Sequence, residues 1–454
     1  MSTMITIDAS TAASGMNFEA FIRGGFISDA TGGGFPVFDN STQFSGTEMM
    51  ISYSSDPASK YVLAHGSLEY FFGTHTVWGE IETIEFGYRG SGSYDGNGFY
   101  IGGDVELRIT GLVDFSNAVS PEAEVEATGA VHNFAIAYMY GASADPARLN
   151  LFGDQLDQYA QHFIGSAYGD VFTGAAFDDL IEGGDGDDTL SGGLGDDTIN
   201  GGAGRDTVVY GGNRADYEIV DNGDGTWTVT DTRTGESNEG QDTVSDVEIL
   251  QFADKSVYLL TGGDDVFSGD SLGLRFSGLE VHGSAGHDYI VTSNSAAHPD
   301  TIYGGDGNDL IFTGGGNDYV DAGDGDDVIH ARGGNETVIG GEGDDTFVIR
   351  FTDTGTTTII DDDGTLWHGT FRPATYPGSW SPAPGATSGY GIGGNATLVG
   401  DGVWNLAVLD QNSAVQNLTL SWSGGDLVMV REGSPQTVVI KDYVNGTFGI
   451  TLEN

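Results

Sequence analysis

The sequence predicts a multidomain fold in which an α+β N-terminal domain precedes two parallel β-rolls, a β-rich insert between the rolls and a β-rich C-terminal cap. At 454 residues the chain is too long for one ordinary hydrophobic core. A nine-residue period fills two blocks rich in glycine and aspartate, whereas the first 164 residues lack this period and mix helical with strand patterns. The expected domains are residues 1–164, 165–209, 210–261, 262–349 and 350–454.

The repeated unit is the nonapeptide Gly-Gly-x-Gly-x-Asp-x-U-x, in which U is a large apolar residue. Full matches are residues 183–191, 192–200, 201–209, 304–312 and 340–348. Degenerate copies begin at Gly165, Gly174, Gly283, Thr313, Ala322 and Ala331, with a twelve-residue break before Gly304. Glycine permits turns with positive φ that expose carbonyl oxygens, and the last three positions alternate as a short strand with U inward. Each nonapeptide is therefore expected to form half a coil.

The acid at the sixth position of each copy is a candidate metal ligand. Ca²⁺ takes about six to eight oxygen ligands, so carboxylates of one coil and carbonyl groups of adjacent turns can complete its shell. The candidates are Asp170, Asp179, Asp188, Asp197, Asp206, Asp288, Asp309, Asp318, Asp327, Glu336 and Asp345. A flexible linker is the alternative interpretation, but a linker would not keep an apolar residue two places after each acid.

The composition also favours a cation as partner. The sequence has 68 acidic residues against 15 basic residues, a formal charge of −53. This balance excludes nucleic acid and anionic membrane surfaces as natural partners. Hydrophobic residues make up 38% of the chain and can build cores once the charge is neutralised, so we expect order with metal and disorder without it. There is no cysteine, which excludes disulfides and thiolate metal sites.

The repeats resemble the RTX (repeats-in-toxin) family, whose members fold as calcium-bound parallel β-rolls outside the cell. The amino terminus lacks the basic and apolar pattern of a cleavable signal, and no apolar run is long enough to span a bilayer. The end of the chain, VNGTFGITLEN, resembles the uncleaved signal of type I secretion substrates. The resemblance implies a secreted, extracellular protein exported by the type I secretion apparatus of a Gram-negative bacterium.

Two β-rich segments flank the second block of repeats. Residues 210–261 contain two alternating strands around an Asn-Gly-Asp-Gly turn, and look like the small insert common in RTX proteins. Residues 350–454 are turn-rich and end in alternating strands such as LTLSWSGGDLVMV. We expect this last segment to close the open end of a solenoid, which otherwise exposes strand edges and apolar side chains.

The first 164 residues are expected to form a separate α+β domain with its own core. Alternating patterns predict antiparallel strands at residues 47–55, 60–72, 77–88 and 104–112. Helical patterns occupy residues 17–26, 121–141 and 146–163.

This order of elements, and the block GSLEYFFGTHTVWGEIETIEFG, resemble the HasA-type hemophores, secreted haem-scavenging proteins with a curved antiparallel sheet backed by helices. In that family a tyrosine ending a Gly-x-Leu-x-Tyr strand coordinates ferric haem, and a histidine before Thr-x-aromatic-Gly hydrogen-bonds the phenolate. The matching residues here are Tyr70 and His75. His132 and Met139 fall where the family lines its pocket. The resemblance implies capture of haem for iron acquisition and an outer-membrane haem receptor as a further partner.

The Tyr70 and His75 pair suits this chemistry. A phenol has a pKa near 10 and must ionise to bind iron, and an imidazole that shares its proton orients it and tunes its basicity. Phenolate ligation favours ferric iron. The family's second ligand is a histidine on an early loop, yet residues 23–48 contain no histidine. Tyr70 is therefore expected to be the only ligand from the protein, or to act with water or an unidentified ligand on the opposite face.

Two other functions are possible for such a chain. An enzyme has little support, because no His-Glu-x-x-His motif occurs, which excludes a zincin metalloprotease. The string GDSLG at 269–273 lies between repeats and not on a strand-to-helix turn, so we interpret Ser271 as a loop serine and expect no enzymatic activity. A surface or biofilm adhesin or matrix protein without haem binding is the main alternative, and a secreted hydrolase is a weaker one. A Soret band in the purified protein separates the hemophore from both.

Overall fold

The computed structural model divides the chain into two compact units. The first holds Met1–Asn222 and Thr226–Lys255, and the second holds Gly223–Gly225 and Ser256–Asn454. The residues that the structure describes are 4–26, 37–38, 45–53, 60–71, 76–90, 92–94, 100–101, 103–112, 115–116, 130–139, 146–235, 237–269, 272, 278–292, 298–343, 345–349, 355–360, 365–368, 390–391, 396–399, 403–409, 415–423, 426–431, 436–441 and 450–453.

An antiparallel sheet forms the first part of unit one. Its strands, in spatial order, are β1 (Met4–Asp8), β8 (Asp104–Thr110), β5 (Thr76–Tyr88), β4 (Lys60–Phe71), β3 (Ser45–Ser52) and β2 (Val37–Phe38). The predicted strands overlap with β3, β4, β5 and β8, although their ends differ by a few residues. The longest pairing joins β4 to β5 from Lys60 opposite Tyr88 to Phe71 opposite Thr76. A short pair, β6 (Ser93–Tyr94) and β7 (Tyr100–Ile101), forms a separate ribbon.

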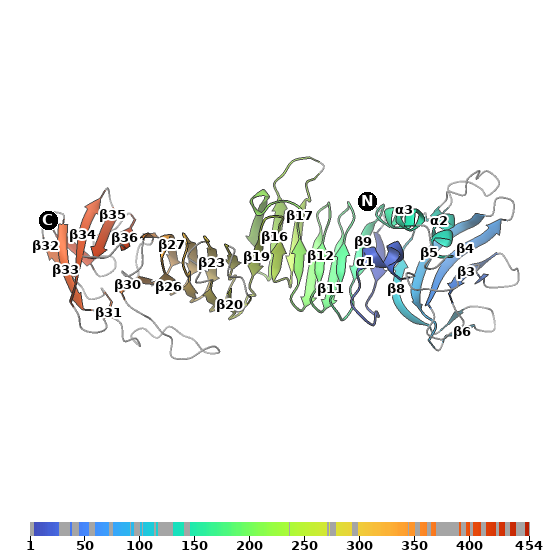
Figure 1. Ribbon diagram of the computed structural model, residues 1–454, viewed down its shortest axis with the longest axis horizontal. Coiled ribbons are helices and arrows are strands. Elements are labelled where there is room, and N and C mark those ends of the chain that lie inside the picture. The colour runs from blue at the N-terminus through green and yellow to red at the C-terminus, as the bar shows by residue number, and fades with distance from the viewer. Residues whose placement is uncertain are drawn as a thin grey trace. The chain divides into compact units, whose positions relative to one another are not determined.

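Helices pack on this sheet through an aromatic core. The helical elements are α1 (Phe18–Ala20), a π-helical turn (Phe21–Gly25), α2 (Ala130–Met139) and α3 (Pro146–Leu156). In Figure 1 α2 and α3 lie next to each other beside β5. The ring of Phe86 on β5 contacts Tyr138 of α2 at 5.1 Å and Phe21 at 5.5 Å. The buried hydroxyl of Tyr138 donates to the carbonyl oxygen of Ile22 (2.5 Å), which fixes the π-helical turn against α2.

Helix α3 ends at Leu156, earlier than the sequence pattern predicts, because residues Ala160–Ile164 form strand β9. This strand pairs in parallel with β1 on one side and with β11 (Leu180–Asp185) on the other. Two partner strands outweigh the local helical pattern, because both offer backbone groups to pair with. The sheet of the N-terminal domain therefore continues, through β1 and β9, into the first β-roll.

The first roll has two faces of parallel strands. One face holds β9, β11, β13 (Thr198–Ala203) and β17 (Gln241–Ser245), and the other holds β10 (Val171–Thr173), β12 (Thr189–Ser191), β14 (Thr207–Val209) and β18 (Ile249–Gln251). Phe172, Leu190 and Val208 lie in register, eighteen residues apart, and are buried. Two nonapeptides therefore complete one coil, as the sequence predicts, and the apolar position points inward.

A hairpin leaves the first roll after β14. It contains a 3₁₀ turn (Arg214–Asp216), β15 (Tyr217–Asp221) and β16 (Thr226–Asp231). Strand β16 pairs antiparallel with both β15 and β17, so the hairpin extends one face of the roll (Figure 1). At its base the ring of Tyr217 packs on Tyr210 (5.1 Å) and Phe252 (4.9 Å).

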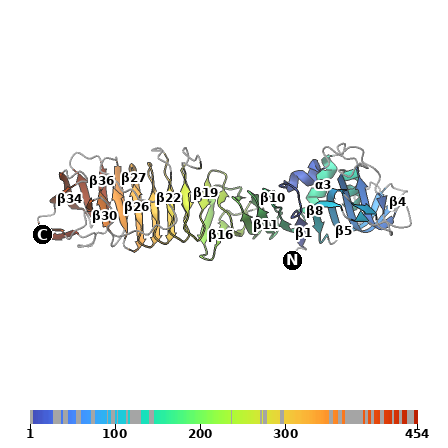
Figure 2. The same ribbon diagram turned by 90° about the horizontal axis from the view of Figure 1, so that it is seen from below.

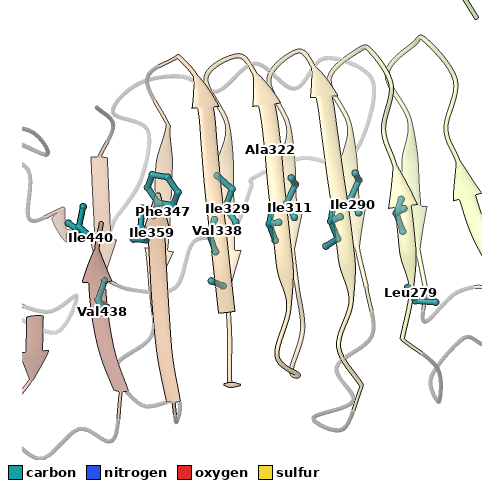
Figure 3. Close-up of a cluster of buried hydrophobic side chains, with 14 of the residues drawn as sticks. Leu279, Ile290, Ile311, Ala322, Ile329, Val338, Phe347, Ile359, Val438 and Ile440 are labelled. Carbon is teal, nitrogen blue, oxygen red and sulfur yellow. The ribbon is translucent and has the colours of Figure 1, made fainter. Parts of the chain in front are cut away.

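The second roll lies in unit two. Its faces are β19 (Ser256–Leu259), β21 (Glu280–His282), β23 (Thr301–Asp306), β25 (Tyr319–Asp324), β27 (Gly334–Glu342) and β29 (Gly355–Ile360), and β20 (Val266–Ser268), β22 (Tyr289–Val291), β24 (Leu310–Phe312), β26 (Val328–Ala331), β28 (Thr346–Ile349) and β30 (Thr365–His368). Figure 3 shows the apolar row between the faces, including Ile290, Ile311 and Ile329. Strand β23 begins at Thr301, within the predicted break before Gly304, and pairs in parallel with β21 and β25 as the other strands of this face do.

Further strands follow the second roll along the chain. β36 (Gln436–Ile440) pairs in parallel with β29, and β35 (Asp426–Arg431), β34 (Val415–Ser423) and β33 (Val403–Leu409) continue antiparallel (Figure 2). Val438 and Ile440 join the apolar row of the roll. The remaining strands are β31 (Tyr390–Gly391), β32 (Ala396–Val399) and β37 (Ile450–Glu453). Within the described part of the chain, no helix is long and apolar enough to cross a membrane.

Candidate metal centres

The first six positions of each nonapeptide form a tight loop. Gly184 and Gly186, at the second and fourth positions, have φ of 105° and 115°, a region that residues with a side chain rarely adopt. A Cβ atom on Gly183, at the first position, would lie 2.3 Å from Oδ2 of Asp188 and 2.4 Å from the carbonyl oxygen of Gly201. Glycine is needed there because a carboxylate oxygen and a carbonyl oxygen of the next coil converge on that position.

The sixth-position acids of the first roll form a ladder along each side. The backbone N–H of Asp170 donates to Oδ1 of Asp188 (2.6 Å), and the N–H of Asp188 donates to Oδ1 of Asp206 (2.8 Å). On the other side the N–H of Asp179 donates to Oδ1 of Asp197 (2.8 Å). Each later acid therefore holds the preceding coil with one carboxylate oxygen.

The second roll repeats this arrangement on one side. The N–H groups of Asp288, Asp309 and Asp327 donate to Oδ1 of Asp309, Asp327 and Asp345, at 2.8, 2.7 and 2.9 Å. The N–H of Asp265 donates to Oδ1 of Asp288 (2.9 Å) and begins the ladder. These five acids form one continuous row.

The opposite side of the second roll is less regular. The N–H of Asp300 donates to Oδ1 of Asp318 (3.0 Å). One coil further, Glu336 is buried and its Oε2 accepts the hydroxyl of Thr357 (3.0 Å). The degenerate repeat at Ala331 thus keeps a buried acid at the sixth position, which is bonded to a side chain of the following coil.

The second carboxylate oxygen is the feature that points to a cation. Among the described residues, buried Oδ2 atoms without a hydrogen-bond partner belong to Asp188, Asp197, Asp206, Asp288, Asp309, Asp318 and Asp327. A buried polar atom left without a partner is costly, and a buried charge is far more so. The loops therefore need a positive partner in order to hold these acids as carboxylates.

Two acids at the start of the first roll differ from the others. Both oxygens of Asp170 and of Asp179 accept backbone N–H groups, those of Met16 and Ser166 for Asp170 and those of Gln161 and Ala175 for Asp179. Met16 and Gln161 precede the repeats in the chain. These two acids therefore link the first coil to the N-terminal domain.

Burial and mutual repulsion disfavour the ionised form of these acids. Burial raises the pKa of Asp188 to about 7 and the pKa of Asp197 and Asp288 to about 8. It raises the pKa of Asp327 to about 9, and the neighbouring carboxylates of Asp309 and others add to the rise. Ionisation of these acids is therefore disfavoured unless a counter-ion lies inside the loops.

The donor set fits calcium. Carboxylate and carbonyl oxygens are the hard ligands that Ca²⁺ prefers. Across the described ranges, no three His, Cys, Asp or Glu side chains converge as a metal site. Backbone carbonyls are common ligands of Ca²⁺ and could complete the shell. The carbonyl oxygen of Gly201 beside Asp188 is one such group.

Sequence reasoning missed four acids that the structure places in the ladders. Asp242 and Glu248 continue the two ladders of the first roll, where they accept the N–H groups of Asp197 (3.0 Å) and Asp206 (2.7 Å). Asp265 and Asp300 belong to the second roll. Asp242, Asp265 and Asp300 have an apolar residue two places later, which is the surviving part of the repeat pattern. Glu248 also has an apolar residue, Leu250, two places later, but its loop spans only residues 246–248 and contains no glycine.

The predicted haem residues are only partly described. Tyr70 is the next-to-last residue of β4, and its backbone pairs with Val77 at the start of β5. His132 and Met139 are residues of α2. His75 lies outside the described residues, as does Ser271. The assignment of Tyr70 and His75 to a haem site therefore stays a prediction from the sequence.

Comparison with known proteins identifies the repeats. The profile of the RTX calcium-binding nonapeptide repeat matches four times, at residues 164–199, 173–208, 297–320 and 313–347. No curated protein matches this sequence significantly. The chain therefore carries RTX calcium-binding repeats, and these wind into a β-solenoid of parallel coils.

Solved structures give weaker similarities. The apo hemophore HasA from Yersinia pestis is 18% identical, with 35% of this chain and 98% of that chain covered and a TM-score of 0.28. The holo form of the same protein is 19% identical over 33% of this chain and 89% of that chain, also with a TM-score of 0.28. The extracellular lipase LipA from Serratia marcescens is 18% identical over 63% of this chain and 38% of that chain, with a TM-score of 0.19.

Proposed function

We propose that this chain is an extracellular calcium-binding RTX protein whose N-terminal domain captures ferric haem for iron acquisition. The calcium part rests on one observation above all, the row of buried carboxylate oxygens without hydrogen-bond partners in the repeat loops. Calcium bound between coils would neutralise these groups and join each coil to the next. The rolls then act as a calcium-dependent carrier for the domain that precedes them.

The proposed haem ligand is the phenolate of Tyr70, with His75 as the partner that takes up or shares its proton. Its support is the sequence pattern around residues 66–79 and the position of Tyr70 at the end of β4. Pairing with β5 fixes the backbone of Tyr70, and a fixed backbone suits a residue that has to hold a ligand in a defined geometry. Phenolate ligation favours ferric iron. Ferric haem is the oxidised form that is expected outside the cell.

A hemin titration of the calcium-loaded full chain tests the haem proposal. Tyr70→Phe keeps the aromatic ring but removes the oxygen ligand, so the Soret band of the bound form should be lost or shifted and affinity should fall. His75→Ala should weaken binding by roughly 10 to 100-fold, the usual effect of losing a group that orients a ligand. Tyr88→Phe, at the other end of the same strand pair, is the matched control. Equal affinity in wild type and Tyr70→Phe would overturn the assignment.

Export is proposed to occur in one step through a type I secretion apparatus of a Gram-negative cell. Low cytosolic calcium would leave the acidic rolls unfolded during passage, and calcium outside would fold them. Deletion of about the last sixty residues should keep the protein inside the cell. Secretion of that shortened chain at the wild-type level would refute this route.

A further inference from the structure

The first roll contains one nonapeptide that a hairpin interrupts. Strand β14 ends at Val209, the ninth position of a repeat, so Tyr210, Gly211 and Gly212 take positions one to three of the next. Strand β17 pairs with β13 with Thr243 opposite Thr198, the seventh position. Residues 240–242 therefore take positions four to six, and residues 213–239 are an insertion inside a repeat loop.

The contacts of the second half repeat those of an intact loop. The N–H of Gln241 donates to Oδ1 of Asp196 (2.9 Å), just as the N–H of Asp196 donates to Oδ1 of Asp178 (3.1 Å). A Cβ atom on Gly240 would lie 2.0 Å from the carbonyl oxygen of Gly195, which is the close approach found between intact loops. The second half of the interrupted repeat thus keeps the register of an uninterrupted one, and the first half begins in register through the bond from the N–H of Tyr210 to the carbonyl oxygen of Gln251 (2.9 Å).

Asp242 occupies the ligand position of this repeat. The N–H of Asp197 donates to Oδ1 of Asp242 (3.0 Å), as the N–H of Asp179 donates to Oδ1 of Asp197 (2.8 Å). Asp197 and Asp242 are each 2% exposed, and Oδ2 of Asp197 is buried without a hydrogen-bond partner. This oxygen belongs to Asp197, which the ladder bond joins to Asp242, and it is the independent sign that a ligand belongs between the two acids. The Asp242 carboxylate itself contacts the hydroxyl of Tyr210.

The charge around the pair is strongly negative. Asp196 accepts the N–H of Gln241 next to Asp242 (2.9 Å), and Glu239 lies three residues before Asp242 in the chain. The positively charged side chain of Arg233 in the hairpin already forms ion pairs with Asp231 (2.6 Å) and Glu239 (3.3 Å). A cation from solution is therefore the partner that balances this loop.

We propose that Asp242 is a calcium ligand and that, with Asp197, it completes a calcium site beyond the residues of the matched repeats. The inference rests on the proposed binding of calcium by the repeats themselves. Both ends of the hairpin would then be fixed by one bound ion. Calcium would order the base of the hairpin, where the buried hydroxyl of Tyr210 lies beside the Asp242 carboxylate, as well as the coils.

The test compares three variants of the full chain. Asp242→Asn keeps the Oδ1 acceptor for Asp197 but removes the charge that a calcium ligand needs. Asp188→Asn makes the same change in a matched repeat, and Glu218→Gln removes one exposed carboxylate from the hairpin. Bound calcium per chain is measured by equilibrium dialysis and elemental analysis, and hydrogen exchange is followed in peptides that cover residues 240–245.

Asp242→Asn should lose one calcium ion, or bind it at least roughly tenfold more weakly, and residues 240–245 should lose their calcium-dependent protection. Residues 301–306 of the second roll should keep theirs, which shows that the variant is folded. Unchanged stoichiometry, affinity and protection in Asp242→Asn, beside a loss in Asp188→Asn, would overturn this inference alone. Absence of calcium binding by the wild-type chain would overturn the proposed function with it.

Discussion

Asp206 holds the backbone N–H of Asp188 with Oδ1, at 2.8 Å, while its Oδ2 is buried without a hydrogen-bond partner. One carboxylate thus serves two purposes, since it joins two coils and keeps an oxygen for a cation. The same division recurs along both rolls, for example between Asp309 and Asp327. Metal binding and coil stacking are therefore coupled through the same side chains, which makes folding sensitive to the ion.

Removal of calcium is the most direct test of this coupling. The region 165–209 has ten acidic residues and one basic residue, so without cations the charge opposes compaction. Circular dichroism should show β structure that disappears in EDTA and returns at calcium concentrations of roughly 10⁻⁴ to 10⁻³ M, typical of extracellular modules. Magnesium at the same concentration is the control. A spectrum unaffected by EDTA would contradict calcium-coupled folding.

The stability of the calcium-free rolls should fall as the pH rises, because burial raises the pKa of the sixth-position acids. The pKa is raised in the fold to about 7 for Asp188 and to about 8 for Asp288, whereas in an unfolded chain it is near 4. At a pH between the unfolded and the folded pKa, the folded state binds more protons than the unfolded state. The stability that these acids contribute is therefore fully present below about pH 4 and is lost as the pH rises through the folded pKa values.

This dependence is measurable by circular dichroism in EDTA from pH 4 to pH 9. We expect β structure to decrease toward high pH without calcium and to persist at pH 8 with it. Calcium affinity should rise with pH, because ions and protons compete for the same oxygens. If the calcium-free protein gained structure as the pH rose, the inference that these loops bury acids with a raised pKa would be wrong.

The first glycine of each repeat offers a steric test of the loops. Gly183→Ala places a methyl group 2.3 Å from Oδ2 of Asp188, so the carboxylate has to move out of the loop. We expect a loss of about 1–3 kcal/mol, as for other overpacked sites, and weaker calcium binding. Urea unfolding and a calcium titration measure both. Gly262→Ala, which meets nothing within 4 Å, should change neither.

Much of the coil structure could be predicted because the repeat encodes it locally. Glycines at fixed positions and an apolar residue two places after each acid determine the half-coil without reference to distant residues. Asp300 could not be found in this way, because three additional residues in its loop shift it out of the period. Asp242 was hidden for a related reason, since the hairpin separates it from the first half of its repeat.

The end of α3 could not be predicted because tertiary pairing decides it. Residues 157–163 continue a helical pattern in sequence, yet Phe163 lies between two parallel partner strands, opposite Ile7 and Ile181. Local patterns do not show which strand edges are available. The same limit applies to the haem prediction, because the pairing of Tyr70 with Val77 fixes its backbone alone. The assignment of Tyr70 as ligand therefore stays a prediction from the sequence resemblance.

The boundary between the N-terminal domain and the first roll gives the last prediction. The ring of Phe172 on β10 stacks on Phe163 of β9 (4.2 Å) and contacts Phe18 of α1 (5.4 Å). The backbone N–H of Met16 donates a hydrogen bond to Oδ1 of Asp170, and the backbone N–H of Val171 donates to the carbonyl oxygen of Met16 (2.6 Å). Domain and roll therefore share a core and a continuous sheet, and they should unfold together.

Phe172→Ala should cost about 3–5 kcal/mol, the usual range for a buried phenylalanine. Hydrogen exchange with calcium present should then increase both in the roll, at residues 180–185, and in the domain, at residues 60–71, because the two lose stability as one cooperative unit. Ile311→Ala, an equally buried core change in the second roll, is the matched control and should leave residues 60–71 protected. If Phe172→Ala increased exchange only in the roll, the domain would be folding independently of the coils, and calcium bound there would not stabilise it.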